Sequence, residues 1–307
     1  MERGGAAVPI GSVVVGMNFN ETSMVAARWA AEHFAPDADL TLVHVVAPPD
    51  RPAFAAELLP ATDTIESSAR RNAEERMREA IASISPRARF EIRVGKPHEQ
   101  IVETARARRA DVIIIGPHDD RHGRSRWLGA TAERIVRESP TPVLVAIDPP
   151  PRPPRTLLVP VSESRLTASI LAWASRFAET FDAEVKLLHV WSESLYAYVA
   201  SRALGGSSDD LEAQRIVEQE IRDATTHWLA DLTEAGFRGR RAAAIVRHGQ
   251  VADATLEIAA ATHADLIVMG RSGGLAIAPS PFGSTLRTVL HRAPCSVFVV
   301  AEPLAGR

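Results

Sequence analysis

The stretch VMGRSGGLAIAPSPFGSTLRTVL, Val268 to Leu290, joins a short apolar run to a glycine-rich loop and the start of a helix. Gly270 ends the apolar run, Gly273 follows three residues later, and Gly283 precedes a Ser-Thr pair. Free main-chain N–H groups at a helix start attract phosphate, and glycine lets the backbone approach the phosphate oxygens. For an isolated loop of this kind, a flexible connection before a capped helix is the alternative. The rest of the chain helps to decide between the two.

Two long segments of the chain follow the same plan. AVPIGSVVVGMNFNETSMVAARWAAEHF and RTLLVPVSESRLTASILAWASRF each contain a β-branched run, a polar turn and an alanine-rich helical pattern. The pairs LTLVHVV and VKLLHVW, and ADVIIIG and ADLIVMG, then recur in the same order. We therefore expect two copies of one domain, 1–148 and 156–307, joined by the proline-rich linker 149–155.

Within each copy, apolar runs alternate with helical patterns. Strands this apolar, with helices between them, are typical of a parallel sheet that is covered on both faces. Right-handed crossovers then favour a doubly wound α/β fold, in which ligands bind where the strand order reverses. In the first copy the patterns predict strands near 11–17, 40–46, 89–94, 111–116 and 143–147, and helices near 22–34, 62–83, 97–108 and 130–138.

Composition excludes several classes of function. A net charge of −3 gives no basic excess for nucleic acid or an anionic membrane. No apolar run approaches the roughly 18 residues of a spanning helix, and the amino end does not resemble a signal peptide. The single cysteine, Cys295, rules out an intramolecular disulfide and favours the reducing cytoplasm. Because only Lys96 and Lys186 are lysines, the glycine loop is not a lysine-bearing P-loop.

The spacing Gly-x2-Gly-x9-Gly-Ser, together with HADLIVMG before it, the LLHV strand and the RAPCSVFVV ending, resembles the universal stress protein family. The tandem arrangement resembles the two-domain members of that family. The resemblance implies two domains of the adenine nucleotide alpha hydrolase-like fold, each with five parallel strands in the order 3-2-1-4-5. One branch of the family binds ATP, and another lacks the loop.

Carried over residue by residue, the resemblance implies a nucleotide site in the second copy. The family has an aspartate where this chain has Ser162, and a hydroxyl reaches less far and carries no charge. ATP is the implied ligand, with Mg²⁺ held mainly by phosphate oxygens and water. The implied contacts are Pro160, Val161, Ser162 and Val190 at the adenine end, and Met269, Gly270, Arg271, Gly273, Gly283, Ser284 and Thr285 at the phosphate and ribose end.

The first copy departs from this pattern. Asp119 replaces the second glycine of its loop and Asp120 follows it, which places carboxylates where a polyphosphate would lie. Ala130 replaces the serine. We therefore expect an impaired or silent site, although three nearby arginines could compensate. Its implied residues are Met17, Asn18, Val45, Gly116, Gly129 and Thr131.

Other polar residues carry simpler interpretations. His118 and His122 lie among glycines and charges without further ligands in the sequence, so we expect no metal site there. His44 and His189 occupy equivalent places in apolar strands, which favours structural roles over catalysis. Cys295 begins an apolar strand, which indicates a buried and unreactive thiol.

No nucleophile, base and orienting group stand together in the sequence, so we expect no dedicated catalytic residues. The favoured hypothesis is an ATP-binding sensor or regulator of the stress response. The alternatives are a slow ATPase or phosphotransferase, and a nucleotide-free scaffold. The resemblance also implies pairing through the last strands of the domains, PVLVAI and SVFVVA, either between protomers in a homodimer or between the two copies. The protein partner is not identified by the sequence.

Overall fold

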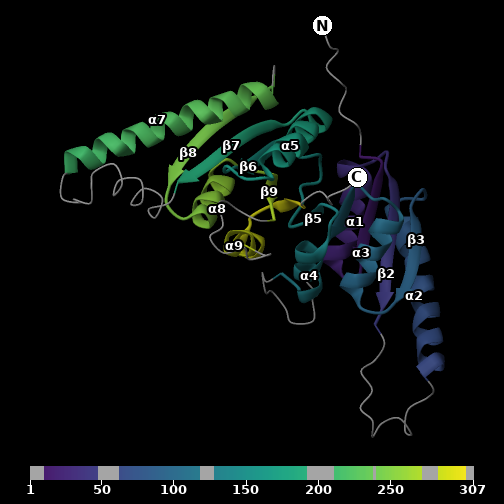
Figure 1. Cartoon of the computed structure of the whole chain (residues 1–307). Helices are drawn as coiled ribbons and strands as arrows, with labels where there is room; N and C mark the ends of the chain where they lie inside the picture. Colours follow the sequence, from purple (N-terminus) through teal and green to yellow (C-terminus); the bar gives the residue numbers. More distant parts are fainter. Residues whose placement is uncertain are drawn as a thin grey trace, which may run out of the picture. The chain divides into compact units, whose positions relative to one another are not determined.

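The computed structural model describes residues 10–47, 62–117, 128–191, 211–237, 240–271 and 283–301. The chain divides into two compact units, whose main parts are Pro9–Pro153, the first unit, and Pro154–Glu302, the second unit. Each unit contains a β-sheet with helices packed on both faces (Figure 1). The expected α/β class is therefore confirmed for both halves of the chain.

In the first unit, strands and helices alternate close to the predicted ranges. The main difference concerns the first helix, which continues after Trp29 as a π-helical turn closed by a 2.9 Å bond from the N–H of Ala35 to the carbonyl of Ala30. The elements are β1 (Ser12–Met17), α1 (Glu21–Trp29), η1 (Ala30–Phe34), β2 (Asp39–Val46), α2 (Thr62–Ile84), β3 (Arg89–Val94), α3 (Pro97–Ala107), β4 (Val112–Ile115), α4 (Ala130–Glu138) and β5 (Val143–Val145).

The strands of the first unit are parallel and follow the order β3-β2-β1-β4-β5. This is the expected order 3-2-1-4-5. Strands β2 and β3 lie on one side of β1, and β4 and β5 lie on its other side, so the strand order reverses between β1 and β4. The residues of β1 from Val13 to Val15 are fully buried, as a central strand covered on both faces requires. Helices α1 and α2 pack together, and α3 packs with α4.

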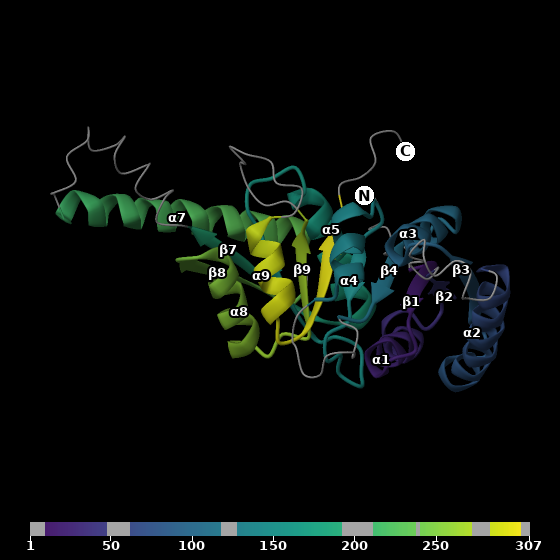
Figure 2. The same cartoon turned by 90° about the horizontal axis from the view of Figure 1, so that it is seen from below.

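The second unit repeats this architecture. Its order, β8-β7-β6-β9-β10, again corresponds to 3-2-1-4-5, with every described pair parallel. Helices α8 and α9 lie side by side, and α5 contacts α7 (Figure 2). The elements are β6 (Thr156–Pro160), α5 (Thr167–Phe181), β7 (Glu184–Trp191), α7 (Leu211–Gly236), β8 (Ala242–His248), α8 (Val251–Ala261), β9 (Leu266–Gly270), α9 (Ser284–Arg292) and β10 (Ser296–Val300).

An aspartate joins the first and fourth strands of each unit at their amino ends. In the first unit, Oδ2 of Asp111 accepts hydrogen bonds from the N–H groups of Gly11 and Ser12, at 2.8 and 3.0 Å. In the second unit, Oδ2 of Asp265 accepts hydrogen bonds from the N–H groups of Arg155 and Thr156 at the start of β6, at 2.8 and 3.1 Å. The Ala-Asp pair that recurs in the sequence therefore has the same structural role in both copies.

The two equivalent histidines also make equivalent contacts. His44 Nδ1 lies 2.8 Å from the carbonyl oxygen of Met17, and His189 Nδ1 lies 2.9 Å from that of Val161. Because a carbonyl can only accept, Nδ1 carries the proton in each ring. His189 packs edge-on against Trp228 of α7, at 5.3 Å between ring centroids. These contacts support the structural role expected of both side chains.

In the first unit, His44 forms part of a stack. The ring of Phe19, which has a φ of 64°, lies 4.5 Å from the imidazole, and the Arg76 guanidinium lies 4.3 Å from the same phenyl ring. Burial lowers the pKa of His44, the bond to Met17 opposes this shift, and the nearby Arg76 charge adds to it. The net effect favours the neutral form of the imidazole.

Candidate functional site

A cavity of about 330 Å³ opens in the second unit at the carboxyl ends of β6 and β9. Because β6 lies between β7 and β9, this is the point at which the strand order reverses. The volume lies within the usual range of small-molecule sites, roughly 300–1,000 Å³. The cavity is lined by Pro160, Val161, Ser162, Ser164, Ile170, Leu188, Val190, Val251, Met269, Gly270, Arg271, Gly283, Ser284, Thr285 and Leu286.

Helix α9 begins at the wall of this cavity. Gly283 is its N-cap, and Ser284 and Thr285 are its first two residues. Within the described residues no side chain caps this end, and the first turn contains no acidic residue. The first N–H groups of a helix have no partner inside the helix and carry the positive end of its dipole. This end of the cavity therefore suits an anion.

The electrostatic character of the cavity follows from its side chains. Among the described lining residues, Arg271 carries the one charge, and the other polar side chains are the hydroxyls of Ser162, Ser164, Ser284 and Thr285. The main-chain N–H of Arg271 donates to the carbonyl of Val300 at 3.1 Å, which fixes the residue at the end of β9. Arg271, the hydroxyls of Ser284 and Thr285, and the start of α9 form a donor set that fits phosphate oxygens.

Hydroxyl bonds shape the loop between β6 and α5. Thr167 Oγ1 donates to the carbonyl of Ser162 at 2.5 Å, and it accepts from the N–H of Ser164 at 3.1 Å. Ser164 Oγ lies 3.1 Å from the same oxygen. Because the only proton of Thr167 Oγ1 is directed at Ser162, Ser164 Oγ must be the donor in that last contact. Ser164 is then left with lone pairs, so it can only accept from a ligand.

The structure brings together ten of the eleven residues predicted for the second-copy site. The eleventh, Gly273, lies outside the described residues. Sequence reasoning missed five further lining residues. Leu188 could have been found, because it lies two positions before Val190 and strand side chains alternate. The other four, which depend on loop shape or on helix packing, are Ser164, Ile170, Val251 and Leu286. That these residues bind a nucleotide stays a prediction.

The residues predicted for the first copy lie in a different setting. Met17 and Val45 are buried, whereas Asn18 is exposed and accepts from the N–H of Asn20 at 3.1 Å. Asn20 in turn caps α1 by accepting from the N–H of Ser23. This cap starts α1 two residues earlier than α5 starts in the aligned second copy.

The early start of α1 affects the space beside Gly116. A Cβ on Gly116 would lie 2.9 Å from Thr22 Oγ1 and 3.2 Å from the N–H nitrogen of Ser23, so the helix start leaves room only for glycine. Gly129 caps α4 as Gly283 caps α9, and Thr131 lies in the first turn of α4. Asp119 lies outside the described residues, as do His118 and His122. The expectation of an impaired first site therefore stays a prediction.

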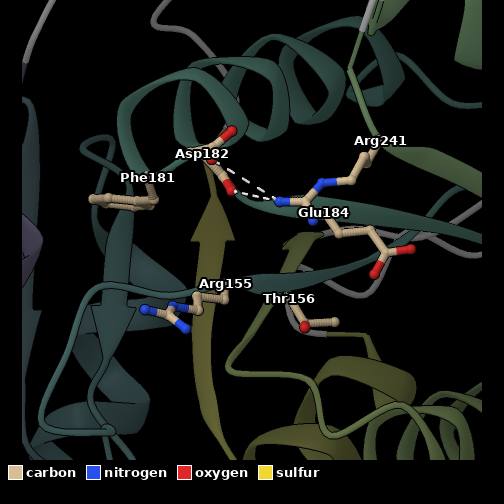
Figure 3. Close-up of a pocket in the computed structure, with 6 residues that line it drawn as sticks. All are labelled: Arg155, Thr156, Phe181, Asp182, Glu184 and Arg241. Carbon is tan, nitrogen blue, oxygen red and sulfur yellow. Dashed lines mark hydrogen bonds and ion pairs between the residues drawn. The ribbon is translucent and has the colours of Figure 1, made fainter.

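A second cavity, of about 470 Å³, lies at the amino ends of β6 and β7 in the second unit (Figure 3). Arg241 donates to the carbonyl of Asp182 at 3.4 Å and lies 4.0 Å from its carboxylate, and Glu184 pairs with Lys186 at 2.6 Å. The lining therefore contains two acidic side chains beside its two arginines. Its lining residues are Arg155, Thr156, Phe181, Asp182, Glu184 and Arg241.

The described part of the chain offers neither a metal site nor a membrane-spanning helix. No group of three or more histidine, cysteine or acidic side chains in that part of the chain is arranged to hold a metal ion. None of the described helices is long and apolar enough to cross a membrane. Cys295 is 6% exposed, and burial together with the nearby Asp265 carboxylate raises the pKa of its thiol to about 12.

The fold and the cavity define a duplicated, doubly wound α/β protein with an anion-suited pocket in its second copy. The chain belongs to the universal stress protein family, whose model matches residues 9–146 and 154–301. A curated relative, universal stress protein MJ0577 of Methanocaldococcus jannaschii, is 32% identical over 75 residues. This match covers 24% of the chain and 46% of the relative, so the chain spans less than half the length of that protein.

Solved structures support the same fold over nearly the whole chain. A universal stress protein from Archaeoglobus fulgidus is similar with a TM-score of 0.65 and 18% identity, covering 95% of this chain and 97% of that one. A functionally unknown protein from Pseudomonas aeruginosa is similar with a TM-score of 0.61 and 16% identity, covering 96% and 93% respectively. At these identities the likeness shows the tandem fold and nothing about the ligand.

Proposed function

We propose that the second unit binds an adenine nucleotide, ATP, and that the protein acts as a nucleotide-dependent regulator in the stress response. The observation that carries the proposal is the start of α9 at the wall of the cavity. Gly283, Ser284 and Thr285 line the same cavity as Arg271, which follows the end of β9. A nucleotide has an anionic tail for this end. It also has an apolar base, which suits the wall formed by Leu188 and Val190.

The lining favours binding over catalysis. The described lining residues include no carboxylate, imidazole or thiol that could serve as a general base or nucleophile. The same set holds no carboxylate for a divalent cation, so Mg²⁺ would be held by the phosphate oxygens and water. These features support a sensor in preference to an ATPase or a phosphotransferase.

The proposal is tested by isothermal titration of ATP and of adenosine into three proteins: the wild type, Gly283→Asp and Gly283→Asn. The backbone of Gly283, at φ −61° and ψ 139°, suits any residue, and a Cβ there would meet the Arg271 carbonyl oxygen at an ordinary 3.9 Å. Aspartate and asparagine are both good N-caps, so α9 is retained in either variant. Only aspartate adds a negative charge beside the phosphates.

We expect Gly283→Asp to weaken ATP binding at least tenfold more than Gly283→Asn does, because like charges at close range repel. Adenosine, which lacks phosphates, should bind both variants alike. Arg241→Ala, in the second cavity, is the matched control and should leave the ATP affinity unchanged. Equal ATP affinity in the Asp and Asn variants would contradict the placement of the phosphates. Absence of ATP binding to the wild type at millimolar concentration would contradict the function itself.

The ligand can also be identified without choosing it beforehand. Small molecules released from the purified protein on denaturation are measured by mass spectrometry. We expect an adenine nucleotide in the wild type and its loss in Gly283→Asp. Recovery of an unrelated compound in both proteins would count against the proposal.

Assembly remains a separate proposal. Pairing of protomers through the last strands stays a prediction. Binding of an unidentified protein partner that depends on the nucleotide held by this chain stays a prediction as well. Analytical ultracentrifugation with and without ATP distinguishes a homodimer from a monomer. A partner that binds wild type and Gly283→Asp equally well, whatever the ATP concentration, would favour a nucleotide-free scaffold.

A further inference from the structure

The strand order of the second unit sets the order in which the parts of a bound nucleotide would lie. The apolar wall of Leu188 and Val190 belongs to β7, and the end that suits phosphate lies at the end of β9 and the start of α9. Strand β6 lies between β7 and β9. The ribose joins the base to the phosphates, so in the proposed function it lies at the end of β6, beside the lining residues Ser162 and Ser164.

Thr167, the first residue of α5, holds the loop that contains these two serines. Its hydroxyl donates to the carbonyl of Ser162 at 2.5 Å and accepts from the N–H of Ser164 at 3.1 Å. Its own N–H donates to the carbonyl of Ser164 at 3.2 Å. Thr167 is not one of the described lining residues, so it acts on the cavity through the two serines.

The same hydroxyl fixes what Ser164 can offer to a ligand. Ser164 Oγ lies 3.1 Å from Thr167 Oγ1 and must donate to it, because the proton of Thr167 is directed at Ser162. The oxygen of Ser164 is left with lone pairs only. The phosphates of fully ionised ATP carry no proton to donate, whereas each ribose hydroxyl does. Ser164 is therefore matched to the ribose and not to the phosphates.

The first unit uses the aligned acceptor for its own helix. Asn20 aligns with Ser164, and Ser23 aligns with Thr167. Oδ1 of Asn20 accepts from the N–H of Ser23 at 2.8 Å and from the hydroxyl of Thr22 at 3.1 Å. Both lone pairs of that oxygen are thus occupied at the start of α1. The acceptor that Ser164 presents to a ligand belongs to the second unit.

We infer that Thr167 is a positioning residue that keeps Ser164 as an acceptor for a ribose hydroxyl, so that the second unit favours ribonucleotides over deoxyribonucleotides. A ligand hydroxyl is recognised strongly where a fixed polar group is left unpaired without it. Ser164 meets this condition because Thr167 takes its proton, and a deoxynucleotide would place a C–H group before the same lone pairs. This inference rests on the proposed function, because it concerns the ribose of the same ligand.

The test is isothermal titration of ATP, 2′-deoxy-ATP and 3′-deoxy-ATP, at mildly alkaline pH, into the wild type and three variants. Ser164→Ala removes the acceptor itself. Thr167→Val keeps the shape of the side chain without the hydroxyl, and Thr167→Ser keeps the hydroxyl. Thermal unfolding of each variant shows whether the second unit is folded, and Ser164→Ala carries the test if Thr167→Val does not fold.

For the wild type we expect at least one deoxy analogue to bind about three- to tenfold more weakly than ATP, which corresponds to one lost hydrogen bond. Thr167→Ser should keep this ratio of dissociation constants, whereas Ser164→Ala and Thr167→Val should bring it close to one. A fold that is merely destabilised weakens the binding of all three nucleotides alike and leaves the ratio unchanged. The ratio therefore separates positioning from a purely structural role.

Equal affinity of the wild type for all three nucleotides would overturn the inference. A wild-type ratio in Ser164→Ala or in Thr167→Val would overturn it as well. Each of these results leaves ATP binding, and with it the proposed function, in place. Failure of ATP to bind the wild type removes the proposed function, and the inference with it.

Discussion

The carboxylate of Asp265 accepts a 3.1 Å hydrogen bond from the main-chain N–H of Thr156. The same oxygen, Oδ2, accepts from the N–H of Arg155 at 2.8 Å. One side chain thus joins the start of β9 to the start of β6, and Asp111 does the same for β4 and β1. Asp265 is buried, whereas Asp111 is partly exposed.

This difference in burial gives a prediction on stability. Asp265→Ala leaves two N–H groups without an acceptor, and we expect it to lower the free energy of unfolding by about 2–4 kcal/mol. Asp111→Ala should lower it by less, because water can reach the N–H groups of the first unit. Urea unfolding followed by circular dichroism measures both. A larger loss in the free energy of unfolding for Asp111→Ala than for Asp265→Ala would contradict this prediction.

The thiol of Cys295 should be unreactive in the folded protein. Its pKa of about 12 leaves a thiolate fraction on the order of 10⁻⁴ at pH 8. We expect no measurable reaction with an aromatic disulfide reagent within an hour, and complete reaction after unfolding in guanidinium. Native protein that reacts as fast as unfolded protein would show that β10 opens readily or that the thiol is accessible.

A third prediction concerns pH and His44. Burial holds the pKa of His44 below 6.5 in the folded state, so the unfolded chain takes up a proton first as the pH falls. The contribution of this side chain is therefore present above pH 6.5 and lost as the pH falls below it. His44→Asn keeps a donor for the Met17 carbonyl but does not titrate.

The measurement is the free energy of unfolding of wild type and His44→Asn at pH 7.5 and pH 5.5. We expect the wild type to lose more stability than the variant over this interval. Equal losses, or a larger loss in His44→Asn, would mean that protonation of His44 is not linked to unfolding.

Gly116, which follows β4, and Gly283, which caps α9, should respond differently to substitution. Gly116→Ala forces a Cβ against Thr22 and the main chain of Ser23, and we expect a loss of about 1–3 kcal/mol in the free energy of unfolding. Gly283→Asn should be close to neutral, because its Cβ has room and the amide can cap α9. Thermal or urea unfolding of the two variants gives the comparison. Tolerance of alanine at Gly116 would show that the start of α1 can move away.

The sequence predicts the fold because apolar runs and their repetition mark every strand of the first unit. It also places ten cavity residues, since glycines at a strand end and before a helix have a recognisable spacing. The early start of α1 is harder to predict, because it depends on Asn20 acting as the cap. Ser164 was missed because its orientation is set by Thr167 and not by any periodic pattern.

The aspartate brace and the helix start of the second unit lie at opposite ends of the same strands. Asp265 holds the amino ends of β6 and β9, while Gly283 begins α9 at their carboxyl ends. Substitutions that change the ligand therefore fall on residues that the brace does not use. In a chain built from two copies of one domain, the residues at the carboxyl ends of the strands can therefore change in one copy while the bonds that join its first and fourth strands persist.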